Sequence, residues 1–373
     1  MRITAVDAIP FTLDRRASLH MRESVSDRSR HVLVRVRTDA GPVGIGEALS
    51  KVSIYGETQD SIVAIIDQHL KPKIVGLDVG DLDEADHRLS TLPANNSARA
   101  ALDIALHDLH GRTVGMSLAH LWGSRKIRQD VSYTVGINPP DTMAADALQQ
   151  FEAHGIRAFK VKGGEDPERD VAALTAIRRA VSNAQLSLDA NQGYTRHAAV
   201  RALIAMAPLE LAYVEEPLPI ADRQGRALLA RQIPMPILGD DSCFTLNDVV
   251  REIELGAIGM VSIKTARTGF TESLRILQTA EAHGLTCIVG SAVGGGLSAA
   301  AALQFACRAT SLDAPSENSF GLNLVSDILR ESPPISGGAM TLPEGTGLGV
   351  DIDDDALARA QQRAKAGSGR RQD

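Results

Sequence analysis

Five ionisable residues end successive short apolar runs of the sequence at nearly constant spacing. They are Lys162, Asp189, Glu215, Asp240 and Lys264, and each lies 24 to 27 residues from the next. A β-strand with its following helix and loops occupies about this length in parallel α/β proteins. Equivalent positions of such a repeat lie at the same end of the sheet, so we expect these side chains to converge on one cavity.

The three carboxylates among them, Asp189, Glu215 and Asp240, predict a metal site. Carboxylates placed together repel each other unless a positive charge neutralises them. Oxygen ligands alone suit Mg²⁺ or Mn²⁺, whereas zinc is disfavoured because no His or Cys shares the pattern. A single acid of this kind is better explained as a loop residue or a helix N-cap, but three in register favour the metal.

Lysines on both sides of the acids indicate proton transfer. Lys160 and Lys162 are two residues apart on one expected strand and therefore share a face. Their proximity and burial would lower the pKa of at least one of them, although such a pair alone is better explained as two surface lysines. Lys264 would face Lys162 across the barrel. Two opposed acid/bases and a divalent cation suit the formation and quenching of an enolate.

A glycine-rich loop precedes an alanine-rich helix in GSAVGGGLSAAAALQFA, residues 290–306. Its backbone amides predict an anion site for a substrate carboxylate at the helix N-terminus. A tight turn with close helix packing explains the pattern equally well. A dinucleotide-binding loop is disfavoured, because no G-x-G-x-x-G follows the first strand.

Two regions of different texture would position these residues. The segment HVLVRVRT, residues 31–38, alternates and runs into a turn at residues 39–42, which is typical of a hairpin. Helical patterns follow to about residue 125. From about residue 126, strand-like and helical segments alternate, which predicts a parallel α/β architecture. We favour a barrel over an open doubly wound sheet, because an open sheet would keep Lys162 and Lys264 apart.

The composition excludes several other classes of protein. The 373 residues include 39 Lys and Arg against 46 Asp and Glu, a formal charge of −7, with only 3% aromatic residues. These values give neither the basic footprint nor the stacking platforms of a nucleic-acid binder. Three Cys without CxxC spacing, no secretory leader and no membrane-length apolar run predict a cytoplasmic protein without disulfides or a membrane partner. The tail from about residue 357 is expected to fray.

At the strand-end acids and lysines, and at the motifs around them, the sequence resembles the enolase superfamily, specifically its muconate lactonizing enzyme subgroup. The resemblance covers nearly the whole chain through HVLVRVRTDAGPVGIGEA, YGET, ALDIALHDLHGRTVG, FKVKGG, LDANQGY, VEEPL, GDDS, SIKTARTGF and GGAMTLPEGTGLGVDID. It implies an α/β fold with an α+β capping domain at residues 1–125 and a modified TIM barrel, (β/α)₇β, at residues 126–322. Residues 323–373 would return to the cap and end in flexible residues.

The resemblance also implies individual roles. The implied ligands of Mg²⁺, or of Mn²⁺ in its place, are Asp189, Glu215 and Asp240. The implied neighbours that stand beside or behind these ligands are Asn191, Glu216 and Asp241. Lys162 and Lys264 would be the opposed acid/bases, and Lys160 would tune Lys162 and touch the substrate carboxylate.

In this family the cap closes over the barrel mouth, and its loops choose the substrate. They correspond here to residues 20–29 and 50–55, so His20, Arg22 and Tyr55 are candidate contacts. Many members carry an acid at the end of the seventh or eighth strand, in a stretch like residues 290–298. Here Gly294 stands in its place, and no acid is found. Gly294 and Gly295 complete the candidate substrate contacts.

The resulting hypothesis is an isomerase of the muconate cycloisomerase type. It would interconvert cis,cis-muconate and muconolactone through a metal-stabilised enolate in aromatic catabolism. Two lysines also suit a racemase or epimerase of an N-acyl amino acid, dipeptide or proline derivative, and an acid-sugar or hydroxy-acid dehydratase remains a further alternative. An ammonium group would need an acid, so the missing acid favours a dicarboxylate. A barrel that binds a small acid without turnover is more distant. The resemblance implies homo-oligomers, up to octamers.

Overall fold

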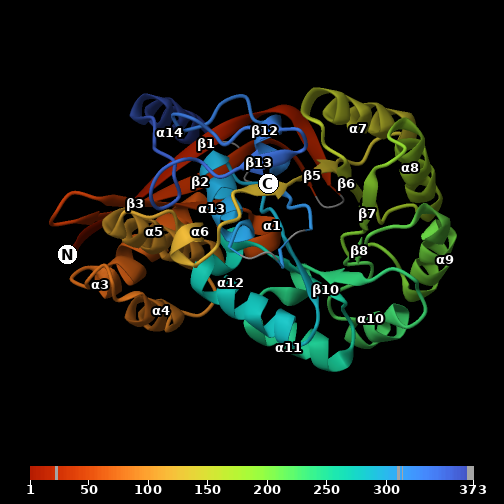
Figure 1. Ribbon diagram of the computed structural model, residues 1–373, viewed down its shortest axis with the longest axis horizontal. Helices are drawn as coiled ribbons and strands as arrows, with labels where there is room; N and C mark the ends of the chain where they lie inside the picture. Colours follow the sequence, from red (N-terminus) through yellow and green to blue (C-terminus); the bar gives the residue numbers. More distant parts are fainter. Residues whose placement is uncertain (22–23, 309–310, 313, 368–373) are drawn as a thin grey trace.

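The computed structural model describes residues 1–21, 24–308, 311–312 and 314–367, without the side chains at 17–26 and 366–367 (Figure 1). Its N-terminal part is an antiparallel sheet in the order β1-β2-β3, formed by Ile3–Met21, Ser24–Thr38 and Val43–Ser50. The hairpin predicted around residues 39–42 is confirmed, because β2 and β3 pair on either side of it. The helical elements that follow are α1 (Val52–Tyr55), α2 (Gln59–Ile65), a π-helical turn (Ile66–Leu70), α3 (Lys71–Ile74), α4 (Leu82–Ser90), α5 (Asn96–Val114) and α6 (Leu118–Leu121).

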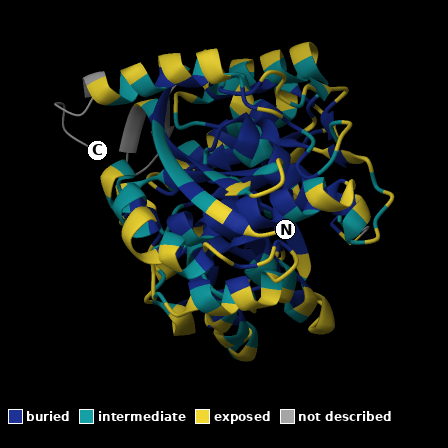
Figure 2. Ribbon diagram, turned by 90° about the vertical axis from the view of Figure 1, so that its left-hand side faces the viewer, coloured by how far each residue is buried: buried dark blue, intermediate teal, exposed yellow. Residues whose placement is uncertain are grey.

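This N-terminal sheet packs on two neighbours, because successive side chains of a strand point to opposite faces. Val32 and Val34 of β2 face the helices and share a buried core with them. Leu33 and Ile45 face the other way and join the core of the barrel together with Phe11. Figure 2 shows the result as buried strands in the interior and exposed residues on the outer helix surfaces.

Gly44 and Gly46 allow β3 to lie directly on α5. A β-carbon at Gly46 would fall 2.0 Å from the carbonyl oxygen of Ala101, too close for any residue but glycine. We therefore expect Gly46→Ala to lower the free energy of unfolding by about 1–3 kcal/mol or more, because the helix must shift. Urea titration measures this loss. Gly321→Ala is the matched control, since no heavy atom lies within 4 Å of its β-carbon position. Equal losses in both variants would contradict this explanation.

Seven further strands form a curled parallel sheet in the order β11-β10-β9-β8-β7-β6-β5. They are β5 (Ser132–Val135), β6 (Ala158–Lys162), β7 (Gln185–Asp189), β8 (Val214–Glu215), β9 (Ile237–Gly239), β10 (Met260–Ile263) and β11 (Thr286–Val289). The helices between and after them are α7 (Pro140–His154), α8 (Pro167–Ala180), α9 (Arg196–Met206), α10 (Arg223–Ala230), α11 (Leu246–Leu255), α12 (Thr265–Ala282) and α13 (Gly296–Ala306). The predicted barrel architecture is confirmed.

Two residues close the barrel between β11 and β5. Ser316 forms a parallel bridge with Val131, the residue before β5. The amide of Glu317 donates to the carbonyl of Val289, at the end of β11, over 2.9 Å. The eighth strand of the (β/α)₇β barrel is thus reduced to a pair of residues, which are followed by a 3₁₀ helix at Asn318–Asn323.

The C-terminal segment crosses back to the N-terminal sheet. Strand β13 (Ala339–Thr341) pairs with β12 (Ile335–Ser336) on one side and with β4 (Arg128–Asp130) on the other, and α14 (Asp354–Gly367) lies against β1. The expectation that the chain frays from about residue 357 is wrong for the described part. Leu357 and Ala360 are buried on one face of α14, which holds the helix in place.

Among the described residues, no helix has the length and apolar character needed to span a membrane.

Candidate active site

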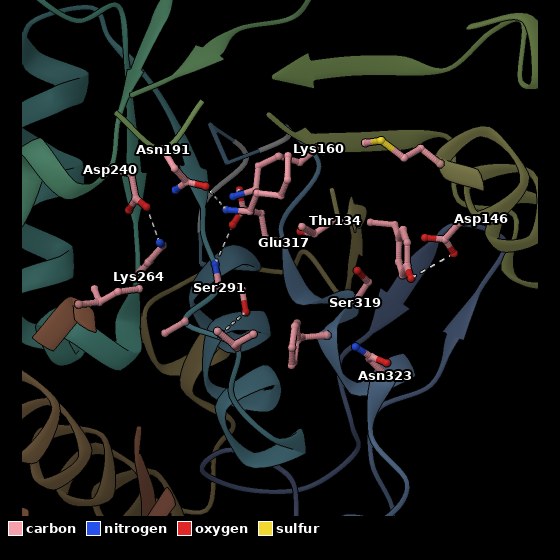
Figure 3. A pocket seen from close by; sticks show the side chains of 18 of the residues that line it. Thr134, Asp146, Lys160, Asn191, Asp240, Lys264, Ser291, Glu317, Ser319 and Asn323 are labelled. Atoms are coloured by element: carbon pink, nitrogen blue, oxygen red, sulfur yellow. Dashed lines mark hydrogen bonds and ion pairs between the residues drawn. The ribbon is translucent and has the colours of Figure 1, made fainter. Parts of the chain in front are cut away.

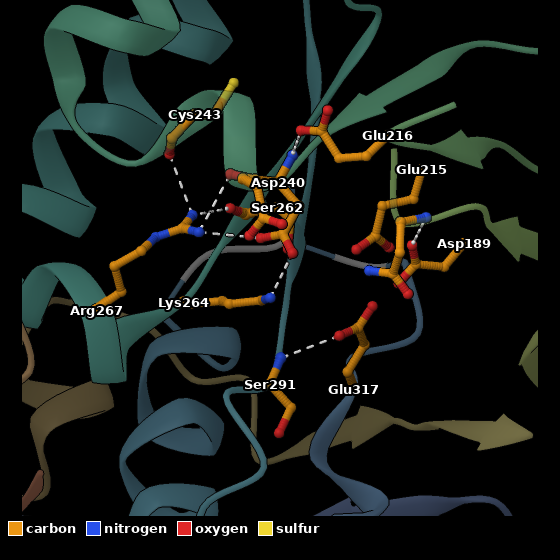
Figure 4. Close-up of polar contacts among 12 residues, drawn as sticks. Asp189, Glu215, Glu216, Asp240, Cys243, Ser262, Lys264, Arg267, Ser291 and Glu317 are labelled. Atoms are coloured by element: carbon orange, nitrogen blue, oxygen red, sulfur yellow. Dashed lines mark hydrogen bonds and ion pairs between the residues drawn. The ribbon is translucent and has the colours of Figure 1, made fainter. Parts of the chain in front are cut away.

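The strand-end residues come together at the carboxyl ends of the barrel strands. Lys162 pairs in register with Asp189, and Asp189 with Glu215, along β6, β7 and β8. Asp240 directly follows β9, and Lys264 directly follows β10. Figure 4 shows the three carboxylates and Lys264 gathered in one region. The constant spacing in the sequence therefore corresponds to a common place in space.

A cavity of about 300 Å³ adjoins this cluster. One end is lined by Lys160, Lys162, Asn191, Asp240 and Lys264, and the other by Tyr133, Thr134, Asp146, Ser319 and Asn323 (Figure 3). Asp189 and Glu215 are each 1% exposed and do not line the cavity. The site is therefore elongated, with its charged groups concentrated at one end.

Each carboxylate of the cluster is held by a lysine. Lys162 Nζ lies 2.6 Å from Asp189 Oδ2, and Lys264 Nζ lies 2.5 Å from Asp240 Oδ2. Lys160 Nζ lies 3.2 Å from Glu215 Oε2. Buried charges are stable only in such pairs, because each alone would lose its hydration.

The pKa values of Glu215, Lys264 and Lys160 are all raised, but for different reasons. Burial, and then the neighbouring charge of Asp189, raise the pKa of Glu215 well above its usual value. Burial lowers the pKa of Lys264, but Asp240 and Tyr55 together outweigh it, so that the pKa of this lysine is raised. The pKa of Lys160 is raised well above normal in the same way, chiefly by Glu215. The expectation that proximity and burial would lower the pKa of Lys160 or Lys162 is therefore wrong for Lys160, because acids and not lysines are its nearest charges.

The donor set suits a hard divalent cation, although its oxygens are turned towards the lysines. In the described parts of the chain, no group of three or more His, Cys, Asp or Glu is arranged around a common metal position. Asp189 and Asp240 nevertheless lie close enough to Glu215 to raise its pKa by repulsion. Mg²⁺ binds carboxylate oxygens and would neutralise the repulsion among these three buried carboxylates.

Residues behind Asp240 fix its backbone and side chain. Glu216 Oε1 accepts hydrogen bonds from the amides of Asp240 and Ser242, both over 2.7 Å. Burial raises the pKa of Glu216 to about 7. Arg267 Nη1 lies 3.1 Å from Asp240 Oδ1, and its Nη2 donates to the carbonyl of Ser262 over 3.1 Å. Sequence reasoning quoted the SIKTARTGF motif but missed this role of Arg267.

The two other candidate neighbours of the ligands lie at the cavity. Asn191 Oδ1 accepts a hydrogen bond from Lys162 Nζ over 3.0 Å. Asp241 accepts one from Gln192 Nε2 over 3.3 Å and, like Asp240, lines the cavity. Asp241 thus stands beside Asp240 rather than behind it.

Glu317 is an acid beside the cavity that was not predicted from the sequence. It follows Ser316 in the two-residue closing strand, lines the cavity, and lies 2.6 Å from Lys160 Nζ through Oε1. Its Oε2 accepts the amide of Ser291 over 3.1 Å. An acid was expected at residues 290–298, directly after β11. Glu317 instead lies in the closing strand, which is too short to show an apolar run in the sequence.

The glycine-rich loop does not present its amides to the cavity. The loop residues that line it are Ser291, Ala292 and Val293, so Gly294 and Gly295 are not the predicted contacts. Gly295 N donates to Glu47 Oε1 over 2.8 Å, and Ser298 N donates to Glu47 Oε2 over 2.9 Å. The chain's own carboxylate therefore occupies the expected anion site at the start of α13.

The candidates from the cap loops have different outcomes. Tyr55 lines the cavity and packs edge-on against Phe244 at 5.8 Å between ring centroids. His20 pairs through its backbone with Val25 in the β1-β2 hairpin, but its side chain lies outside the description. Arg22 lies outside the described residues altogether.

The far end of the cavity carries acid and amide groups. Tyr133 Oη donates to Asp146 Oδ1 over 3.3 Å, and burial raises the pKa of Asp146. Among the described residues that line the cavity, the only cations are Lys160, Lys162 and Lys264, all at the near end. A ligand that extends to the far end meets hydrogen-bonding groups and a carboxylate.

Comparison with known proteins agrees with this architecture and site. Residues 7–123 match the N-terminal domain of the mandelate racemase / muconate lactonizing enzyme family, and residues 142–356 match the enolase C-terminal domain-like family. A muconate lactonizing enzyme from Mucobacterium Smegmatis, solved with muconolactone, superposes with a TM-score of 0.94 at 36% identity, covering 96% of this chain and 99% of that one.

Epimerases are also similar. The L-Ala-D/L-Glu epimerase of Bacillus subtilis is 32% identical over 86% of this chain and 88% of its own. A dipeptide epimerase from Enterococcus faecalis, solved with Mg and the dipeptide L-Leu-L-Tyr, has a TM-score of 0.89 at 26% identity, covering 94% of this chain and all of that one. The chain belongs to the mandelate racemase / muconate lactonizing enzyme family of the enolase superfamily, whose members near it are isomerases acting on small carboxylates.

Proposed function

We propose that this protein is a Mg²⁺-dependent cycloisomerase that interconverts cis,cis-muconate and muconolactone. The observation that carries the proposal is the placement of Lys162 and Lys264 on β6 and directly after β10, at one end of a single cavity with buried carboxylates between them. The similarity to the muconate lactonizing enzyme with bound muconolactone, at 36% identity, supports this reaction over others of the family.

The proposed metal ligands are Asp189, Glu215 and Asp240. Their oxygen-only chemistry and the repulsion that raises the pKa of Glu215 support this assignment. A divalent cation held there would supply positive charge for the oxyanion that develops on the substrate carboxylate. Lysine ammonium groups supply that charge to the three carboxylates now, so a cation and the lysines compete for the same oxygens. Glu216 and Arg267 would keep Asp240 in place in either case.

The proposed acid/bases are Lys162 and Lys264. In the direction of muconate formation, one of them removes a proton from the methylene beside the carboxylate of the lactone. The electron pair left on carbon forms the new double bond and breaks the ring C–O bond, which releases the second carboxylate. The lysine keeps the proton as an ammonium group. In the direction of lactone formation, the same ammonium returns it. Lys160, held by Glu317 at 2.6 Å, would lie beside the substrate carboxylate as a fixed positive charge.

The ultraviolet absorbance of cis,cis-muconate tests this proposal. Purified protein with Mg²⁺ is expected to remove the diene absorbance and to produce muconolactone, and EDTA is expected to stop the loss. Deuterium placement in the lactone then gives the face of addition. If the absorbance remains unchanged with both Mg²⁺ and Mn²⁺, muconate is not the substrate.

Epimerisation of a dipeptide is the second candidate, and the acids of the cavity favour it. Glu317 and Asp146 line the cavity, so the earlier argument that no acid is available for an ammonium group no longer holds. Exchange of the α-proton of dipeptides and N-acyl amino acids in D₂O tests this reaction directly.

Glu317→Gln separates the two candidates. If Glu317 binds a substrate ammonium group, this variant should raise the KM for the dipeptide tenfold or more, because the charged partner is lost. Steady-state kinetics on each substrate measure the effect. Glu252→Gln is the matched control, because Glu252 is equally buried but pairs with Arg226 between α10 and α11. An unchanged KM for the dipeptide would remove Glu317 from substrate binding.

A further inference from the structure

A buried histidine and a buried glutamate meet on the face of the N-terminal sheet that packs against the barrel. His31 Nδ1 of β2 lies 2.7 Å from Glu47 Oε1 of β3, and the residues are 0% and 3% exposed. The ring of Phe11 stacks on His31 at 5.0 Å between ring centroids. Burying such a pair is costly, and apolar residues of the same size would pack at least as well. The pair therefore calls for an explanation other than packing.

Glu47 uses both carboxylate oxygens to hold the barrel. The amide of Gly295 donates to Oε1 over 2.8 Å and the amide of Ser298 to Oε2 over 2.9 Å. These amides belong to the first turn of α13 and the residue before it, where unpaired N–H groups and the helix dipole favour a negative charge. Burial raises the pKa of Glu47, but His31 and these amides together outweigh it and lower the pKa overall. Glu47 is thus suited to remain a carboxylate.

The segment that Glu47 holds is a wall of the cavity. Ser291, Ala292 and Val293, directly before Gly294, line the cavity near Lys264 (Figure 3). Val293 has a φ of 68°, a strained value for a β-branched residue, so the surroundings must impose this conformation. Ser29 of β2 supplies a second tie, because its Oγ donates to the carbonyl of Val293 over 3.2 Å.

The same face of β3 also touches the wall through apolar contacts. Leu49, two residues after Glu47, packs with Ala266 and Ala292 in a small buried cluster. Tyr55 and Val293 border that cluster, so α12, the cavity wall and the cap loop at residues 50–55 meet there. A displacement of residues 291–295 would therefore change the shape of the cavity next to the reacting groups.

We infer that Glu47 is a positioning residue, which fixes residues 291–295 as the cavity wall and so sets the affinity for substrate from the N-terminal sheet. His31 orients the carboxylate, and Glu47 reaches the cavity only through the loop it holds. The inference rests on the proposed function only in that this cavity is where the substrate binds. It applies equally to a cycloisomerase and to an epimerase.

Glu47→Gln tests the inference, because glutamine keeps the shape but can accept from only one of the two amides in this geometry. We expect hydrogen–deuterium exchange of peptides covering residues 290–299 to become about tenfold faster or more, in keeping with the loss of one charge-assisted hydrogen bond. On the substrate that the wild type accepts, KM should rise about tenfold while kcat changes less than threefold. Ser29→Ala should shift both readouts in the same direction by a smaller factor and does not disturb the buried charges.

Glu252→Gln is again the matched control, since it removes the charge of an equally buried, paired glutamate that does not line the cavity. It should change neither the exchange at residues 290–299 nor KM. A purely structural role for Glu47 would lower thermal stability in its variant and leave KM unchanged, which overturns the inference. If the wild type turns over neither muconate nor dipeptides, the proposed function fails. Hydrogen–deuterium exchange in Glu47→Gln is then the remaining test of the inference. Unchanged protection at residues 290–299 in this variant overturns it.

Discussion

Replacing Lys264 with alanine is expected to lower the rate of proton exchange and turnover by about 10²- to 10⁴-fold, the usual contribution of a positioned general acid or base. The variant should stay folded, because Arg267 still pairs with Asp240 at 3.1 Å and neutralises it. Single-turnover kinetics with muconolactone or muconate, at saturating Mg²⁺, measure the loss. Circular dichroism confirms that the fold is kept.

Lys162→Ala is the informative companion to this variant. Lys162 and Lys264 approach the cavity from β6 and β10, so the lysine that faces the reacting carbon should show the larger loss of exchange. Lys71→Ala, in the helix α3 of the cap, is the surface control and should behave like the wild type. Near-normal turnover in both Lys162→Ala and Lys264→Ala would remove the lysines from the chemistry.

Glu215→Gln is expected to abolish the stabilisation of the protein by Mg²⁺ without destabilising the metal-free protein. The raised pKa of Glu215 means that its charged form is disfavoured in the fold, by burial first and then by Asp189. Because the pKa of Glu215 in the fold lies above its value in the unfolded chain, this group costs stability at any pH above the unfolded value, so a neutral glutamine of the same shape should leave the melting temperature equal or higher at pH 7–8.

Thermal unfolding with and without Mg²⁺ measures both effects. In the wild type a bound cation raises the melting temperature as its concentration passes the dissociation constant, and in Glu215→Gln this rise should vanish. Activity should fall with it by about 10²-fold or more, since the developing oxyanion loses its positive partner. The Glu252→Gln protein should respond to Mg²⁺ like the wild type. A Mg²⁺-induced rise that persists in Glu215→Gln would show that the cation binds elsewhere.

The sequence was sufficient to predict the barrel and the strand-end cluster, because both follow from a local repeat. Each strand of a parallel barrel points the same way, so residues 24 to 27 positions apart return to the same end. The placement of Asp189, Glu215 and Lys264 needed no knowledge of long-range contacts. The α-helices between them carry ordinary helix-forming residues, which made the alternation visible.

Features that depend on contacts distant in the sequence could not be predicted. Glu317 was missed because a two-residue strand has no periodicity to detect. The start of α13 was assigned to a substrate anion, whereas Glu47, about 250 positions earlier, binds its amides. The pKa direction of Lys160 was wrong because it depends on which charge lies nearest, and that is Glu317 at 2.6 Å.

Deuterium exchange into muconolactone tests the central claim most directly, because it requires the carboxylate cluster, the cation and a lysine together. Muconolactone is incubated in D₂O with the protein and Mg²⁺, and the methylene beside its carboxylate is followed by NMR. We predict that deuterium enters this position with Mg²⁺ and does not enter with EDTA or in the Glu215→Gln protein. Exchange that proceeds equally well in EDTA, or no exchange at all in the presence of Mg²⁺, would contradict cation-assisted proton transfer on muconolactone in this cavity.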